Sequence, residues 1–412
     1  MLNKLIIILF VSLLLLLNIS QAEDFNIEPP KAKPGIDVLL TKKLDLISGK
    51  KVGLITNQTG VTSDIRSTID ALNSAPQVKL VALFGPEHGV RGDIEGGQKV
   101  PQYVDKKTGV TVYSLYGDVK KPTPEMLKHV QVLIYDIQDI GFRAYTYIYT
   151  MALAMEAAKE AGIPVIVLDH PNPLGGNRVE GNVLDSKFSS FVGMYPIPFI
   201  YGMTVGELAK LFNEEFNIKC DLTVVPMEGW RREMSYDDTG LTWVPTSPHV
   251  PHAETSFLVS TTGCIGELHT VSVGVGYTSP FELIGAPWID GQLLADKLNS
   301  LKLPGVYFRP TSFRPYYQNF IKELCSGVQI HILDKQLFSP AKTQIYILST
   351  INKLYPKHDI FKTVRISSFD KAYGTDQIRL QLMKGISARK IISLWEDDLE
   401  NFRKIREKYL IY

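Results

Sequence analysis

The chain has 412 residues and carries 44 Lys and Arg residues against 43 Asp and Glu residues. This length normally corresponds to two domains, or to one domain with a large appendage, and is ample for a sizeable hydrophobic core. The near-neutral charge provides no general attraction to nucleic acid or to an anionic membrane, so neither is expected as a partner. Three cysteines allow at most one disulfide bond, and buried unpaired thiols fit the composition as well.

The first 22 residues have the pattern of a secretory signal peptide. Lys4 supplies a positive charge, residues 5–19 are apolar, and the small residues Ser20 and Ala22 favour cleavage after Ala22. The alternative is an uncleaved membrane anchor, for which the apolar run is short. We therefore expect an exported protein, periplasmic or secreted, without stable membrane insertion after cleavage.

Short apolar runs alternate with helical patterns through the first half of the chain. The predicted strands lie at 51–56, 78–84, 111–117, 131–137 and 163–169. The predicted helices lie at 67–73, from Pro124 onward, at 144–162 and at 204–216. Strands that are nearly continuous in Val, Ile and Leu are buried on both faces, and their alternation with helices indicates a parallel sheet. The expected fold is α/β, with a Rossmann-like, doubly wound parallel sheet.

The pattern changes near residue 245 to loops rich in Pro, Gly and Ser. Later elements are fewer: helices are predicted at 293–301, 339–355 and 393–409, with a strand at 328–334. We predict a signal peptide at 1–22, a Rossmann-like N-terminal catalytic domain at 23–245, and a smaller C-terminal auxiliary α/β domain at 246–412.

Four of the apolar runs end in polar clusters marked by Gly or Pro, at 56–60, 85–93, 136–143 and 169–176. In open parallel sheets, ligands bind at the carboxyl ends of the strands, so these clusters predict one site rather than four solvated loops. The polar side chains in question are Asn57, Gln58, Glu87, His88, Asp136, Asp139, Asp169 and Asn172.

The residue types at these strand ends favour glycoside hydrolysis. The sequence has neither of the common glycine-rich phosphate loops and no G-x-S-x-G elbow, which argues against nucleotide binding and against a serine hydrolase. Carboxylates beside a histidine suit acid–base cleavage of a sugar linkage, which requires no cofactor. Tyr145 offers a ring face to a sugar, and Arg91 and Arg143 offer cations to a carboxylate.

A metal-dependent hydrolase is the main chemical alternative. Two histidines and two aspartates at the strand ends, with His249 and His252 in a Pro-containing loop, are the candidate ligands. The sequence contains no H-E-x-x-H or comparable pair of ligands on a helix, so no metal site is predicted.

With these motifs in view, the chain resembles the family of exo-acting β-N-acetylmuramidases, formerly a domain family of unknown function. The matching motifs span most of residues 35–330 and include "GLITNQTGV", "LFGPEHGVRGD", "DIQDIGFRAYTYIYTM", "VLDHPNPLGG" and "PFELIGAPWID". The resemblance implies an active-site cleft between an N-terminal Rossmann-like domain and an auxiliary domain. It also implies release of N-acetylmuramic acid from the non-reducing ends of peptidoglycan fragments. The expected partners are therefore muramyl saccharides. Glu87 and His88 match the family's catalytic pair.

The sequence departs from the family pattern before "PFE", where relatives commonly read "EGTNxSxGRGT" and this chain reads "ELHTVSVGVGYT". Thr270 and Val275 therefore stand where Asn and Arg are usual. This departure motivates an alternative from another class, a non-catalytic protein that binds cell-wall sugars.

The second catalytic carboxylate is chosen among three aspartates. A residue at the very end of a strand is held by the sheet, which favours Asp136 or Asp169 over Asp139, and Asp139 is placed to pair with Arg143. We choose Asp136 and expect its carboxyl group within roughly 10 Å of that of Glu87, facing the same cavity. The predicted catalytic residues are thus Glu87, His88 and Asp136. The predicted substrate-binding residues are Asn57, Gln58, Arg91, Asp139, Arg143, Tyr145, Asp169 and Asn172.

Overall fold

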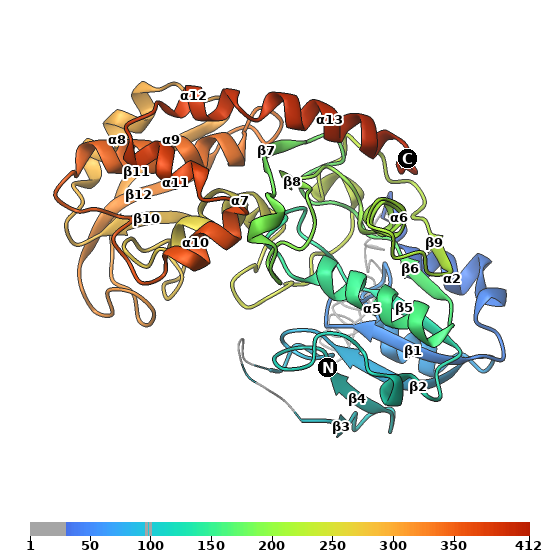
Figure 1. The fold of residues 1–412 in the computed structure, drawn as a ribbon. Helices are drawn as coiled ribbons and strands as arrows, with labels where there is room; N and C mark the ends of the chain where they lie inside the picture. The colour runs from blue at the N-terminus through green and yellow to red at the C-terminus, as the bar shows by residue number, and fades with distance from the viewer. Residues whose placement is uncertain (1–29, 95–97, 99–100) are drawn as a thin grey trace, which may run out of the picture. The chain divides into compact units, whose positions relative to one another are not determined.

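A seven-stranded sheet forms the centre of the N-terminal half (Figure 1). The computed structural model describes residues 30–94, 98 and 101–412, so the predicted signal peptide lies outside the described residues. The strands are β1 (Lys51–Thr56), β2 (Lys79–Gly85), β3 (Tyr103–Val104), β4 (Thr111–Ser114), β5 (Val132–Asp136), β6 (Val165–Leu168) and β9 (Leu222–Val225). Their order in the sheet is β3-β4-β2-β1-β5-β6-β9, and every neighbouring pair is parallel except β3 and β4.

This strand order contains a topological switch point between β1 and β5. The chain adds β2 and then β4 on one side of β1, and afterwards adds β5, β6 and β9 on the other side. Loops that leave the carboxyl ends of β1 and β5 therefore diverge, and the crevice between them is the usual ligand site of such sheets.

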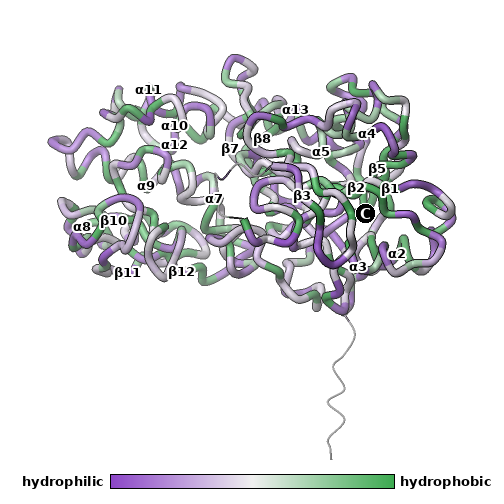
Figure 2. Tube along the Cα trace, turned by 90° about the horizontal axis from the view of Figure 1, so that it is seen from below, coloured by the Kyte–Doolittle hydropathy of each residue, from purple (hydrophilic) through white to green (hydrophobic). Residues whose placement is uncertain are grey.

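Helices cover both faces of the sheet, which confirms the predicted doubly wound α/β fold. The helices are α2 (Gly35–Lys42) and α3 (Thr68–Asn73) on one face, and α4 (Pro124–Leu127), α5 (Tyr147–Ala161) and α6 (Val205–Glu215) on the other. Alternate residues of β5 enter different hydrophobic clusters: Val132 and Ile134 pack with α2 and α3, whereas Leu133 and Tyr135 pack with α5 and α6. Figure 2 shows hydrophobic residues along the central strands β1 and β2.

Local signals explain where the helices begin and end. The Thr204 hydroxyl accepts a hydrogen bond from the Glu207 amide, and the Glu207 carboxylate accepts one from the Thr204 amide, so a capping box starts α6. Gly162 ends α5 in a left-handed conformation with φ of 67°. Helix α5 was predicted to begin at residue 144 and begins at Tyr147. The residues before it form a turn in which the Tyr145 amide donates to the Phe142 carbonyl.

The C-terminal half is built around a three-stranded antiparallel sheet in the order β10-β12-β11. Its strands are β10 (Leu283–Ala286), β11 (Val306–Phe313) and β12 (Cys325–Ile332). The helices are α7 (Thr255–Gly266), α8 (Gly291–Ser300), α9 (Pro340–Leu354), α10 (Ile366–Tyr373), α11 (Gln377–Met383), α12 (Ala388–Ser393) and α13 (Glu396–Glu407). A two-stranded ribbon of β7 (Glu180–Val183) and β8 (Pro198–Ile200) lies between β6 and β9 in sequence, and all these elements belong to one unit, Lys31–Tyr412.

Helix α7 was not predicted, because its sequence is rich in Ser, Thr and β-branched residues, which disfavour helix on propensity alone. In the folded chain, the hydroxyls of Ser260, Thr261 and Thr262 donate to carbonyls four residues earlier in the helix. The side-chain hydroxyl groups that disfavour helix in water thus have hydrogen-bond partners within α7, where they are buried.

Two further findings bear on the sequence expectations. All three cysteines, Cys220, Cys264 and Cys325, are buried and unpaired, as in the alternative without a disulfide bond. Among the described residues, no helix has the length and hydrophobicity required to cross a bilayer.

Candidate functional site

The candidate site is a cavity of about 510 Å³ whose walls come from both halves of the chain. From the N-terminal half come Glu87, Phe142, Ala144, Tyr145 and the loop residues 190–192, and the loop that follows this half adds Ser247, His249 and Val250. The other wall consists of Val259, Gly263, Cys264 and Glu267 of α7 and its C-cap, Phe281, and Ser368, Lys371 and Ala372 of α10. A volume of this size lies within the range of small-molecule sites.

Glu87 is held by a tight loop at the carboxyl end of β2. The Leu115 amide donates to the Gly85 carbonyl at 2.8 Å, and the chain then reverses through His88 and Gly89, whose φ angles are 71° and 74°. A Cβ atom at Gly85 would lie 3.1 Å from the Val90 nitrogen, closer than side chains normally approach. The glycines in "GPEHG" thus allow the turn that directs Glu87 into the cavity.

Tyr116 lies beside Glu87. Burial, together with the hydrogen bond to the Glu87 carboxylate, raises the pKa of Tyr116 to about 12. The phenol therefore stays protonated at neutral pH and donates its hydrogen bond to Glu87. This contact restrains the carboxyl group from the side of β4.

His88 is next to the cavity, whereas His249 lines it. The Nδ1 atom of His88 lies 3.2 Å from the Ile94 carbonyl oxygen, and the Nε2 atom of His249 lies 2.8 Å from the Tyr317 hydroxyl. Burial and the nearby charge of His88 lower the pKa of His249, so its imidazole is neutral at physiological pH. The sequence pointed to His249 as a candidate metal ligand and not as a predicted site residue.

Tyr145 and Gln58 place the segment that carries His249. The Tyr145 hydroxyl donates to Thr246 Oγ1 at 2.9 Å, and Gln58 Nε2 donates to the Pro245 carbonyl at 2.9 Å. Tyr145 also lines the cavity. Asn57 instead orders its own loop, because its Oδ1 atom accepts the Thr59 amide at 2.9 Å, while its buried Nδ2 atom has no partner in the described part of the chain.

The structure does not place Asp136 in the cavity, which corrects the expectation that it faces Glu87. Asp136 is fully buried, and its carboxylate is engaged by His170 Nε2 at 2.6 Å and by the Thr68 hydroxyl. Asp136 is thus enclosed by two partners and is absent from the residues that line the cavity. His170 accordingly has a structural role, as the partner of the Asp136 carboxylate.

Asp139 and Asn172 order the loops at the ends of β5 and β6 rather than line the cavity. Asp139 accepts hydrogen bonds from the Gly141 amide at 2.8 Å and from the Tyr201 hydroxyl, so the expected pair with Arg143 does not form. Its Oδ1 atom is buried and has no hydrogen-bond partner among the described residues, and burial raises the pKa of Asp139 from 3.8 to about 6. Asn172 Nδ2 donates to the Met203 carbonyl at 2.9 Å.

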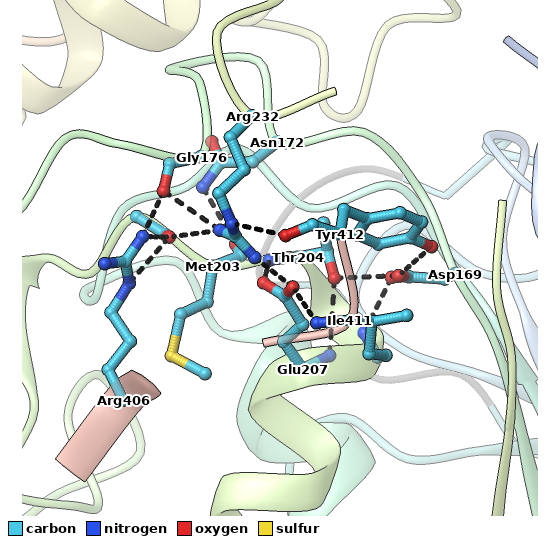
Figure 3. A network of polar contacts seen from close by, with 12 residues as sticks. Asp169, Asn172, Gly176, Met203, Thr204, Glu207, Arg232, Arg406, Ile411 and Tyr412 are labelled. Atoms are coloured by element: carbon cyan, nitrogen blue, oxygen red, sulfur yellow. Dashed lines mark hydrogen bonds and ion pairs between the residues drawn. The ribbon is translucent and has the colours of Figure 1, made fainter. Parts of the chain in front are cut away.

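Asp169 belongs to a separate polar network in which the last residues of the chain take part (Figure 3). Its carboxylate accepts hydrogen bonds from the Thr204 hydroxyl and the Tyr412 hydroxyl, each at 2.7 Å, and from the Gly206 amide at 2.7 Å. Burial nevertheless raises the pKa of Asp169 to about 6.

The same network continues through Glu207, which accepts hydrogen bonds from the Ile411 amide at 2.8 Å and from Arg232. Figure 3 shows Ile411 and Tyr412 beside Glu207 and Thr204 at the start of α6, with Arg232 reaching the same place from another loop. Asp169 thus anchors the C-terminal segment to β6 instead of contacting the cavity.

The two predicted arginines are also committed elsewhere. Arg91 forms ion pairs with Asp70 and Asp105, each at 3.1 Å, which tie its loop to α3 and to the residues after β3. Arg143 is fully buried and donates to the carbonyls of Asn182 at 2.8 Å, Ile197 at 3.0 Å and Tyr373. Neither arginine lines the cavity, which corrects their assignment as clamps for a substrate carboxylate.

The described residues contain no group of three or more His, Cys, Asp or Glu side chains arranged to hold a metal ion. The cavity residues that the sequence did not reveal are those of the C-terminal wall, above all Glu267, Ser368 and Lys371. These residues lie in segments without a polar motif. The family resemblance implied a cleft between two domains, and this was the only indication that the C-terminal half contributes to the site.

Comparisons with known proteins agree with this architecture. A family model described as "Exo-beta-N-acetylmuramidase NamZ, N-terminal" matches residues 52–254, and the corresponding C-terminal model matches residues 259–412. The peptidoglycan beta-N-acetylmuramidase NamZ of Bacillus subtilis (strain 168) is 53% identical over 383 residues, which cover 93% of this chain and 92% of the relative.

Two crystal structures of DUF1343 family proteins from Bacteroides fragilis NCTC 9343 are similar to the whole unit. One shares 46% sequence identity with a TM-score of 0.89 and covers 93% of this chain and 99% of its own. The other shares 30% identity with a TM-score of 0.75 and covers 92% of this chain and 99% of its own.

The position of Arg143 predicts a structural role. Arg143→Met should lower the free energy of unfolding by about 2–4 kcal/mol, because buried carbonyl groups lose a charged donor. Urea denaturation followed by circular dichroism measures the change. Arg389→Met, at an exposed residue of α12, is the matched control and should cost under about 0.5 kcal/mol. Equal stabilities of the two variants would contradict this role.

Asp139 predicts a specific pH dependence of stability. Its folded pKa of about 6 exceeds the ordinary value of 3.8, so the stability it contributes is complete below pH 3.8 and is lost as the pH rises through 6. Asp139→Asn removes this ionisation. The free energy of unfolding of the variant, relative to that of the wild type, should therefore rise by up to about 3 kcal/mol between pH 4 and pH 7. The Tm of each protein, measured across this pH range, follows this change. A difference that stays constant over this range would show that Asp139 is not protonated in the folded state.

Proposed function

The chain belongs to the exo-β-N-acetylmuramidase NamZ family, and we propose that it releases N-acetylmuramic acid from the non-reducing ends of peptidoglycan fragments. Membership confirms the predicted family and the predicted enzyme class, a glycosidase. The substrate follows from the relative in Bacillus subtilis, whose name assigns it to peptidoglycan. The observation that carries the proposal is the carboxyl group of Glu87 on the wall of a cavity large enough for a terminal sugar.

Glu87 is the proposed proton donor to the glycosidic oxygen. A carboxyl group that protonates the leaving oxygen must project into the sugar site from a fixed backbone, and the turn after β2 provides this. The second carboxylate on the cavity wall, Glu267, forms an ion pair with Arg365 at 3.0 Å. Glu267 is thus engaged by a cation, whereas Tyr116, a partner of Glu87, is a neutral phenol, which favours Glu87 for the catalytic role.

With Asp136 and Asp169 committed to buried networks, the second catalytic role passes to the histidines beside Glu87. His88 matches the pair implied by the family resemblance, and His249 lines the cavity as a neutral imidazole. A neutral imidazole can accept a proton from the attacking water. We therefore propose His88 and His249 in place of the aspartates.

The alternative of a non-catalytic sugar-binding protein was based on Thr270 and Val275, and their contacts in the structure do not favour it. The Thr270 hydroxyl donates to the Ile360 carbonyl at 2.9 Å, and Val275 packs against the hydrophobic core. Neither Thr270 nor Val275 lines the cavity, whereas His249, which stands where Asn is usual in the family, does.

Domain roles and location are part of the same proposal. Within the proposed catalytic domain, 23–245, lie Glu87 and the sheet, and the proposed auxiliary domain, 246–412, adds further residues of the cavity wall. Export to the periplasm or the medium, inferred from the first 22 residues, would bring the enzyme to peptidoglycan.

Replacement of Glu87 tests the proposal directly. Glu87→Gln preserves the size of the side chain but cannot donate a proton, so kcat on a chromogenic β-N-acetylmuramide should fall by about 10²–10⁴. Tm should stay within about 2 °C of the wild type, because Glu87 stands on a cavity wall. Glu267→Gln is the matched control and should lose much less activity. An E87Q enzyme with more than about a tenth of wild-type turnover would refute the assignment.

A further inference from the structure

We propose that Lys371 recognises the lactyl carboxylate of the terminal sugar and thereby selects N-acetylmuramic acid over N-acetylglucosamine. The inference rests on the proposed function and names the residue that sets its substrate preference. N-acetylmuramic acid differs from N-acetylglucosamine by an ether-linked lactyl group, which carries one negative charge at neutral pH. An enzyme that selects this sugar requires a cation at the position of that charge.

Lys371 is the single Lys or Arg among the described residues that line the cavity. It stands in the last turn of α10, its side chain is exposed, and it forms no ion pair within the described part of the chain. Its amine is therefore free to bind an anion that enters from solvent.

The other charges around the cavity already have partners. The Glu267 carboxylate is bound by Arg365 at 3.0 Å, and the Glu87 carboxylate receives the Tyr116 hydroxyl. The arginines predicted for this role, Arg91 and Arg143, are held by carboxylates and by carbonyls outside the cavity. The geometry thus leaves Lys371 as the cationic group available for a substrate carboxylate.

The surroundings of Lys371 strengthen this selection. Val259, Gly263, Phe281 and Ala372 form an apolar wall in the same cavity, and they exclude water from a bound sugar. An ion pair in such partly dry surroundings is stronger than one on an open surface. A neutral hydroxyl in place of the lactyl group would leave the ammonium group without this partner.

Arg143 fixes the position of Lys371. The guanidinium donates to the carbonyl of Tyr373, the last residue of α10, two residues after Lys371. Asn182 Nδ2 donates to the same carbonyl at 2.8 Å. The end of α10 is thus attached to the N-terminal half, so the distance from Lys371 to the catalytic wall is set by buried hydrogen bonds.

The kinetic test compares two substrates in one variant. In Lys371→Met, kcat/KM for a chromogenic β-N-acetylmuramide should fall about 10- to 100-fold, the usual worth of a charged hydrogen bond. Activity on the matching N-acetylglucosaminide should change less than about threefold. Lys384→Met, at an exposed lysine of the same half of the chain, is the control and should alter neither. Equal losses on both sugars would overturn the proposal.

A binding test separates this inference from the proposed function. Isothermal titration of N-acetylmuramic acid and of its methyl ester should show that K371M weakens binding of the acid and leaves the uncharged ester unchanged, and that K371E weakens the acid further. Equal affinity of wild type and K371M for the acid would refute the role of Lys371. A wild-type enzyme that binds the acid but hydrolyses no muramide would refute the proposed function alone.

Discussion

The buried guanidinium of Arg143 holds the two walls of the cavity together. It leaves the loop after β5 and donates to the carbonyls of Asn182, Ile197 and Tyr373, of which the last ends α10. No carboxylate neutralises it in the described residues, and burial lowers the pKa of Arg143 to about 10. The carbonyl end of a helix carries partial negative charge and offers part of the missing compensation. The position of α10, which carries Lys371, relative to the N-terminal half, which carries Glu87, thus depends on one buried cation.

Several properties of the fold could be predicted from sequence because they depend on local pattern. Apolar runs without alternation predicted strands that are buried on both faces, and β1, β2, β5 and β6 lie within or close to the predicted ranges. Glycines in "GPEHG" predicted a tight turn, and Gly89 adopts the left-handed conformation that such a turn needs. Glu87 could be chosen because the carboxyl end of a parallel strand is where a sheet presents polar groups to a ligand.

The role of the other strand-end residues could not be predicted in the same way. Asp136, Asp139 and Asp169 follow strands just as Glu87 does, yet each is enclosed by donors from distant segments, such as Thr68, Tyr201 and Tyr412. A carboxylate that organises loops and one that performs chemistry look alike in one sequence. What separates them is contact with residues far along the chain. Lys371 could not be predicted for the same reason, because no polar motif lies near it in the sequence.

The central claim is that a terminal muramyl residue binds between Glu87 and Lys371. The most direct measurement is a crystal structure of the E87Q variant with a muramyl disaccharide that it cannot cleave. We expect the glycosidic oxygen in hydrogen-bond contact with the side chain at position 87, and the lactyl carboxylate within about 4 Å of the Lys371 amine. A sugar bound outside the cavity, or one whose lactyl group points away from α10, would contradict it.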